Sequence, residues 1–241
     1  MNRARTRALV IAICLIVFSA LVVSRRAGPQ PLPERPPSER PVLLLITSLP
    51  LMFGEQFSLQ DSGSPALGAL QKRYRVAPIG VSDARQLAKG RLLLMAHPLA
   101  QPAEDLVALD QWVRRGGRLL LLADPLLEWP SSRPLGDPLR PPPMFMDTGL
   151  LAHWGLSFAP PGERGPAMRD LDGWPVLTVS PGKLSGRCPV SSDGLVADCR
   201  IGKGYATIIA DADFLDVDRL GSQSKHNLDA LMTELAKLEA K

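Results

Sequence analysis

Two apolar runs with a helical pattern between them form the clearest unit of the chain. Residues 92–96 and 119–123 are apolar at every position, which is typical of strands buried on both faces, as in parallel sheets. Between them, Leu106, Leu109 and Val113 have the spacing of one helix face. The segment therefore predicts a strand–helix–strand unit with parallel strands, a connection that is right-handed in nearly every known sheet.

The rest of the chain extends this unit into an α/β domain. Further strands are expected at 42–47, 75–79 and 205–210, and helices at 65–74, 83–89, 147–154 and 224–240. This alternation predicts a doubly wound, mostly parallel sheet. Residues 125–146 contain too many prolines for regular structure, so we expect a functional or mobile loop there.

The N-terminal 26 residues have the pattern of a membrane anchor. Residues 8–23 form an uncharged apolar run, slightly short of the roughly 20 residues of an ideal spanning helix, and flanking arginines can snorkel to cover the difference. A cleaved signal peptide has the same layout, but Arg25 and Arg26 directly after the run disfavour cleavage. We therefore expect residues 1–26 to be a single-pass transmembrane helix. Its N-terminus should lie inside the cell, since three arginines precede the run and two follow it.

A proline-rich linker separates this anchor from the domain at residues 42–241. Residues 27–41 contain six prolines. Such a segment forms an extended spacer of about 40 Å in polyproline geometry. A disordered tether of no defined length is the alternative.

The charge distribution argues against a nucleic-acid partner. The net charge is +4, but five of the 28 basic residues precede the first acidic residue, Glu34. The remaining 23 basic residues face 24 acidic residues, a net charge of −1 beyond residue 26. Without a basic surplus in the domain, we expect the membrane to be a partner and nucleic acid not to be one.

A hairpin insertion is predicted around Asp193-Gly194, a favoured two-residue turn. This turn pairs residues whose numbers sum to 387, so Cys188 faces Cys199 within disulfide range. The same count places Pro189 at a non-hydrogen-bonded site and the cysteines at a hydrogen-bonded pair. Two free thiols are the alternative to a bridge. A bridge would require an oxidising compartment.

Two motifs together give the chain a family resemblance. Residues 106–125 read LVALDQWVRRGGRLLLLADP, and residues 202–215 read GKGYATIIADADFL. Over residues 41–241 the chain resembles the membrane-anchored auxiliary proteins of gliding-motility-type ABC transport systems. The resemblance implies a class I glutamine amidotransferase-like, flavodoxin-like fold. It also implies permease and nucleotide-binding subunits as partners. With its N-terminus inside, the anchor would place the domain on the periplasmic side of a bacterial inner membrane.

The same resemblance argues against catalysis. In active amidotransferase-like enzymes a nucleophilic cysteine follows the strand that matches residues 119–122, where this chain has Asp124 and Pro125. A carboxylate cannot replace the thiolate, and the proline removes a backbone N–H from the expected oxyanion hole. The catalytic histidine of the family would follow a late strand, where this chain has Asp211 and Asp213. We therefore expect no catalytic residues.

Candidate binding residues lie where the predicted strands end, because ligands of open α/β sheets collect beyond the carboxyl ends of the strands. They are Thr47, Ser48, His97, Asp124, Asp211 and Asp213. Some have structural alternatives: Pro98 would hold His97 extended at the surface, Asp124 would form an Asx turn, and Asp211 and Asp213 would cap backbone amides. The aspartates lack the spacing of a calcium loop, so we expect no metal and no cofactor.

The sequence thus predicts a non-catalytic, membrane-tethered binding or scaffolding subunit of an ABC-type transporter. Two alternatives remain open. One is a divergent hydrolase that uses His97 and Asp124. The other is an extracytoplasmic small-molecule sensor that uses the same cleft.

Overall fold

The computed structural model of the protein describes residues 28–54 and 63–241. The transmembrane helix expected within residues 1–26 lies outside these ranges. Of the helices that the structure describes, none has both the length and the apolar character needed to cross a bilayer.

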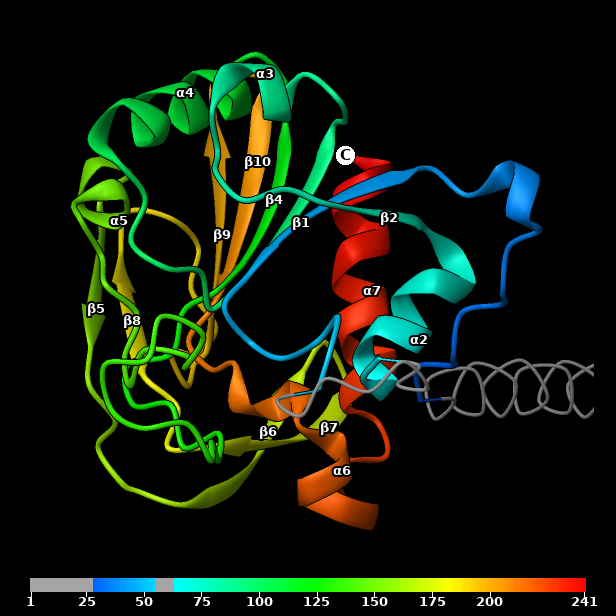
Figure 1. Ribbon diagram of the computed structural model, residues 1–241, viewed down its shortest axis with the longest axis vertical. Coiled ribbons are helices and arrows are strands. Elements are labelled where there is room, and N and C mark those ends of the chain that lie inside the picture. The colour runs from blue at the N-terminus through cyan, green and yellow to red at the C-terminus, as the bar shows by residue number, and fades with distance from the viewer. Residues whose placement is uncertain (1–27, 55–62) are drawn as a thin grey trace, which may run out of the picture.

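A six-stranded sheet in the order β2-β1-β3-β4-β10-β9 forms the centre of the domain (Figure 1). Its strands are β1 (Val42–Thr47), β2 (Arg75–Pro78), β3 (Leu92–Ala96), β4 (Arg118–Leu122), β9 (Val196–Ile201) and β10 (Gly204–Ile209). All neighbours pair in parallel except β9, which is antiparallel to β10 at one edge. The predicted mixed α/β fold with a mostly parallel sheet is therefore confirmed, and the order 2-1-3-4 is that of flavodoxin-like sheets.

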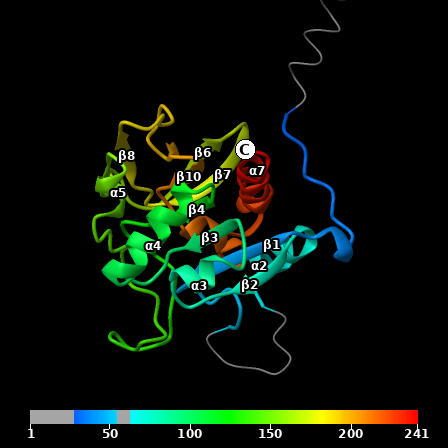
Figure 2. The same cartoon turned by 90° about the horizontal axis from the view of Figure 1, so that it is seen from above.

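Helices cover both faces of this sheet, which explains the continuous apolar runs of its strands. Helices α2 (Pro65–Arg73) and α7 (Asn227–Ala240) pack on one face, and α3 (Ala84–Leu87) and α4 (Ala103–Arg114) pack on the other. Figure 2 shows α4 and α7 on opposite sides of the central strands. Successive strand residues point to opposite faces, so Leu94 joins the core that contains Leu231 of α7. Its neighbour Leu93 joins the core that contains Leu109 of α4.

Two small antiparallel sheets accompany the main sheet. One pairs β5 (Leu156–Ala159) with β8 (Lys183–Gly186), and the other pairs β6 (Pro166–Leu171) with β7 (Trp174–Val179). The predicted insertion was a hairpin in which residues before Asp193 paired with those after it. This was wrong in extent, because β8 pairs with β5 while β9 completes the main sheet.

The cysteine-bearing segment keeps the predicted register but not the predicted hydrogen-bonding pattern. Val190 pairs with Ala197, and their residue numbers add up to the predicted 387. The Asp198 amide donates to the Pro189 carbonyl at 2.9 Å, so Pro189 lies at a hydrogen-bonded site. In antiparallel pairs the two site types alternate, so the cysteines occupy the more closely spaced, non-hydrogen-bonded site. A disulfide joins Cys188 to Cys199, with their Cα atoms 5.0 Å apart.

The proline-rich segment at residues 28–41 packs on the domain, so its described part is neither a stand-off spacer nor a disordered tether. The Arg35 amide donates to the Lys72 carbonyl at 3.0 Å, and the Arg73 guanidinium donates to the Pro33 carbonyl. The side chain of Leu32 packs against the core on the α2 and α7 face. Proline does fix an extended backbone here, but tertiary contacts decide where that backbone lies. We call residues 28–41 the strap.

Candidate functional site

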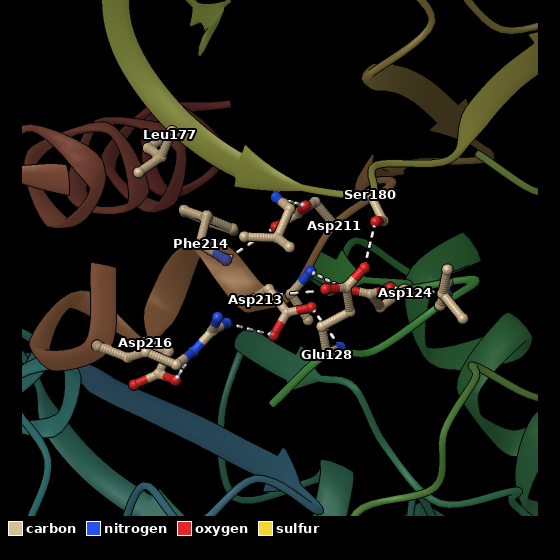
Figure 3. Close-up of polar contacts among 12 residues, drawn as sticks. Asp124, Glu128, Leu177, Ser180, Asp211, Asp213, Phe214 and Asp216 are labelled. Atoms are coloured by element: carbon tan, nitrogen blue, oxygen red, sulfur yellow. Dashed lines mark hydrogen bonds and ion pairs between the residues drawn. The ribbon is translucent and has the colours of Figure 1, made fainter. Parts of the chain in front are cut away.

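The carboxyl edge of the main sheet brings together aspartates from distant parts of the sequence (Figure 3). Asp124 follows the last residue of β4 by two positions, and Asp211 follows the last residue of β10 by two. Because Leu122 of β4 is the register partner of Ile209 of β10, the two aspartates leave the sheet at equivalent points. Asp213 follows in the 3-10 helix η2 (Asp213–Leu215).

Asp124 uses both carboxylate oxygens to bind backbone amides. Its Oδ1 accepts from the Leu126 amide at 2.9 Å, which is the expected Asx turn. Its Oδ2 accepts from the amides of Ala212 at 2.8 Å and Asp213 at 3.3 Å. The side chain is fully buried. Asp124 therefore joins the end of β4 to the segment after β10.

Asp211 has the same role between other elements. Its Oδ2 accepts from the Val179 amide at the end of β7, and its Oδ1 accepts from the Phe214 amide, both at 2.8 Å. Close by, the Asn227 side chain at the start of α7 donates to the carbonyls of Leu177 and Phe214. The small β6–β7 sheet is thereby fixed to the carboxyl edge by buried polar contacts.

Asp213 completes the cluster together with Glu128, which the sequence interpretation did not single out. The Asp213 carboxylate accepts from the Glu128 amide at 2.7 Å and from the Arg219 guanidinium at 3.2 Å. The Glu128 carboxylate in turn accepts from the Ser180 hydroxyl (Figure 3). Glu128 lies in the irregular segment after β4, so no periodic pattern marks it in the sequence.

Burial raises the pKa of each of these aspartates, because desolvation disfavours the charged form. The pKa of Asp124 rises to about 6 and that of Asp213 to about 7, while that of Asp211 also lies well above its ordinary value. The amide hydrogen bonds oppose this increase, and nearby carboxylates add to it: Glu128 raises the pKa of Asp124, and Asp124 raises the pKa values of Asp211 and Asp213. Among residues 28–54 and 63–241, no group of three or more histidine, cysteine or acidic side chains is placed to hold a metal ion.

His97 is buried, contrary to the expectation of an extended surface residue. Its φ of 47° lies in the left-handed region, so Pro98 does not hold it extended. The ring Nε2 lies 2.9 Å from the Pro142 carbonyl. Nδ1 is buried and has no hydrogen-bond partner among the described residues. Burial lowers the pKa of His97 to about 4, so the ring is neutral near pH 7.

Thr47 and Ser48 connect the end of β1 to the end of β3. The Thr47 hydroxyl donates to the Ala96 carbonyl at 2.9 Å, and the Ser48 hydroxyl donates to the His97 carbonyl. The Thr47 hydroxyl also accepts from the Leu49 amide at 2.9 Å. Both side chains thus make local structural contacts, and both are partly exposed.

The proline-rich loop at residues 125–146 covers this edge of the sheet. Its Pro142 carbonyl contacts His97, and its Phe145 amide donates to the Asp124 carbonyl at 2.6 Å. The loop side chains Leu127 and Trp129 pack against the core. His97 and the aspartates therefore lie beneath the loop and not in an open cleft.

The contacts define what these groups do chemically in the folded protein. The oxygens of Asp124 and Asp211 are engaged by backbone amides, and neither carboxylate contacts the His97 ring. Acid–base catalysis requires a group within hydrogen-bond reach of a substrate. In this conformation the cluster is a structural junction of the chain segments that leave the sheet.

A family model described as "ABC-type uncharacterized transport system" matches residues 40–161. The chain belongs to this family. The family is one of auxiliary proteins of ABC-type transport. The match includes the strand–helix–strand unit and the whole loop that covers the carboxyl edge. No curated protein matches the chain.

Several solved structures are similar to this auxiliary protein at low identity. An exo-β-1,4-mannosidase, Op5Man5 from Opitutaceae bacterium strain TAV5, has a TM-score of 0.49 at 14% identity; the match covers 81% of this chain and 36% of that one. Cytoplasmic protein STM1381 from Salmonella typhimurium LT2 has a TM-score of 0.48 at 14% identity; the match covers 82% of this chain and 99% of that one. A thua-like protein from Bacteroides uniformis has a TM-score of 0.41 at 9% identity; the match covers 88% of this chain and 94% of that one. The chain spans about a third of the length of the mannosidase, and we draw no conclusion from similarities this low.

Proposed function

We propose that this auxiliary protein is a non-catalytic binding or scaffolding subunit, tethered to the bacterial inner membrane beside the permease and nucleotide-binding subunits of its transporter. One observation carries the proposal. The side chains at the carboxyl edge, where α/β proteins bind ligands, make structural hydrogen bonds to backbone amides beneath a covering loop. A surface that binds a partner protein needs no open cleft.

The covering loop offers such a surface. It carries four exposed apolar side chains, which we call the loop surface: Leu135, Leu139, Met144 and Met146. The exposed fractions of Leu135 and Leu139 reach 84% and 68%. Exposed apolar residues gathered on one part of a protein often mark an interaction site. Membership of an ABC-type transport family makes transporter subunits the natural partners.

The membrane tether and the location of the domain are parts of the same proposal. The apolar run at residues 8–23 supports an anchor. The disulfide between Cys188 and Cys199 supports an oxidising, extracytoplasmic location for the domain. If the anchor is uncleaved, the protein stays in membranes after carbonate extraction with Met1 or Asn2 at its N-terminus. A mature N-terminus near Arg25 or later would contradict an anchor.

The proposal includes an amidotransferase-like ancestry for the domain. The 2-1-3-4 strand order supports it, as does the position of Asp124 directly beyond β4, where the nucleophile of that fold would lie. In this chain the position serves a structural contact. Loss of the nucleophile with retention of the fold fits a subunit that binds and does not catalyse.

Affinity purification tests the scaffolding role. A tagged full-length chain is purified from detergent-solubilised membranes of its native cells, and co-purifying proteins are identified by mass spectrometry. We expect a permease and a nucleotide-binding subunit, and their reproducible absence would contradict the proposal. L135D and L139D should reduce their recovery several-fold. M168D is the matched control, because Met168 is a similarly exposed apolar residue on β6.

A further inference from the structure

Arginines gather at the edge of the main sheet opposite the covering loop. β2 begins with Arg75, β4 begins with Arg118, and Arg91 directly precedes β3. Arg40 stands two residues before β1. Because these strands are parallel, their first residues lie along one edge of the sheet. This amino edge is therefore cationic, although the domain as a whole carries almost no net charge.

A hollow of about 410 Å³ opens on this amino edge. Lys89, Arg91 and Arg118 supply its positively charged lining, and Val42 and Leu92 supply apolar lining. A volume of this size falls within the range of small-molecule sites.

The two arginines of the hollow lie at the start of adjacent strands. The Arg118 amide donates to the Arg91 carbonyl at 2.9 Å, which fixes them as neighbours on adjacent strands. Both guanidinium groups lie next to Gly116. An alanine there would place its Cβ atom 3.4 Å from Nη2 of Arg91 and 4.0 Å from Nη1 of Arg118. The Arg118 guanidinium donates to the Gly116 carbonyl and lies over the Tyr205 ring, with Cζ 5.4 Å from the ring centroid.

The positive charge of the hollow is not neutralised by the residues around it. Lys89, Arg91 and Arg118 form no ion pair with any described residue, and Nε of Arg118 is buried without a hydrogen-bond partner among them. Glu239 also lines the hollow, but its carboxylate is 3.0 Å from the Arg35 guanidinium and accepts from the Tyr74 hydroxyl at 3.2 Å. Adjacent like charges repel, so an anion in the hollow would stabilise this arrangement.

We propose that this hollow binds a phosphate-type oxyanion, carried by a small molecule or by a lipid headgroup. Paired guanidinium groups match the geometry of phosphate oxygens and bind them through charge-assisted hydrogen bonds. The apolar lining of Val42 and Leu92 accommodates the uncharged part of the ligand. The site lies at the opposite edge from the loop surface, so it is independent of the proposed scaffolding role.

Binding measurements on the full-length chain in an uncharged detergent test the site. Isothermal titration with inorganic phosphate and with glycerol phosphate probes a soluble ligand. Mixed micelles that contain phosphatidylglycerol, compared with phosphatidylcholine at equal ionic strength, probe a lipid headgroup. We expect R91A to weaken binding about tenfold, the usual effect of losing one charged hydrogen-bond donor. Arg91 is exposed, so this substitution leaves the core unchanged.

R115A is the matched control, because Arg115 is an exposed cation at the same edge that does not line the hollow. R118M is a second variant, which keeps the side-chain stem and removes the guanidinium group; its melting temperature reports whether it folds. Binding that R91A weakens and R115A does not would support the site. If the phosphate titrations respond, the ligand is a small molecule; if the phosphatidylglycerol micelles respond, it is a lipid headgroup. Equal effects of R91A and R115A would overturn the proposal, and so would no binding of any probe.

Discussion

The carboxylate of Asp124 accepts a hydrogen bond from the backbone amide of Ala212 at 2.8 Å, across 88 residues of sequence. This contact joins two neighbouring parallel strands just beyond their carboxyl ends. The edge that usually binds ligands in α/β proteins is here fixed by buried hydrogen bonds. The polar residues at this edge therefore hold chain segments together.

Replacing Asp124 should destabilise the domain. D124A removes the acceptor for the amides of Leu126, Ala212 and Asp213 and leaves buried donors unsatisfied. The expected cost is about 3 kcal/mol, since each such group costs about 1–3 kcal/mol. For a domain of this size that corresponds to a decrease in melting temperature of roughly 6–12 °C. Thermal unfolding followed by circular dichroism measures it.

The control for this prediction is D218A, which removes an exposed carboxylate at the same edge of the domain. Exposed substitutions change stability by about 0.5 kcal/mol or less. Equal melting temperatures for D124A and D218A would contradict a structural role for Asp124.

Glu234 in α7 should make stability depend on pH. Burial, reinforced by the nearby Asp198, raises the pKa of Glu234 to about 7, above its ordinary value of 4.5. The folded state therefore binds this proton more tightly than the unfolded state. Its contribution to the free energy of unfolding is complete below about pH 4.5 and is lost as the pH rises through about 7.

E234Q mimics the protonated side chain and removes this loss. The melting temperature of E234Q minus that of the unmodified protein should therefore be larger at pH 8 than at pH 5. His97 and the carboxyl-edge aspartates are present in both proteins, so their titration cancels in the difference. E104Q, which changes an exposed carboxyl group in the first turn of α4, should show no such trend. A constant difference for E234Q would refute the prediction.

The disulfide should persist in cells and stabilise the domain. In an oxidising compartment, Cys188 and Cys199 resist thiol labelling until a reductant is added. The sequence separation of 11 residues closes a small loop, and the entropy model gives about 3 kcal/mol for its loss. Labelling of protein from intact cells in a C14S background measures the state of the bond. Equal labelling with and without reductant would rule the bond out.

The strap should detach when its apolar contact is removed. L32D places a charge against the core on the α2 and α7 face, at a position where Leu32 is half-buried. Backbone that leaves its docked conformation becomes accessible to proteases. Cleavage by a glutamyl endopeptidase after Glu34 or Glu39 should therefore accelerate about tenfold or more. Q30D, which adds the same charge at an exposed position of the strap, should cleave at the original rate.

Retention of slow cleavage in L32D would show that Leu32 does not hold the strap. The remaining contacts would then suffice, among them the ion pair of 3.0 Å between Arg35 and Glu239. A combined substitution of Leu32 and Arg35 separates these contributions.

A hairpin at β6 and β7 illustrates a signal that the sequence held but the prediction left unused. Asp172 and Gly173 connect the two strands with φ angles of 53° and 85°. Positive φ at both central residues is the hairpin turn that Asp-Gly favours. The same dipeptide at residues 193–194 was used to predict the cysteine register, which the structure confirms through the pairing of Val190 with Ala197.

The site residues show where sequence reasoning reached its limit. Strand ends predicted that Asp124 and Asp211 would lie at one edge of the sheet, and they do. Their partners are backbone amides of residues such as Val179 and Ala212, and backbone amides carry no sequence signature. His97 was expected at the surface, but the loop that buries it contacts it through a carbonyl group 45 residues away.

The sequence by itself determined the parallel strands of the main sheet, because apolar runs such as Leu92–Ala96 must be buried on both faces wherever they lie. Only the tertiary structure decided that the strap packs on the domain, that β8 pairs with β5, and which distant backbone amides the aspartates bind. These choices depend on which distant groups come within about 3 Å of each other. The periodicity of apolar residues predicts whether a side chain is buried, but not which distant group it contacts.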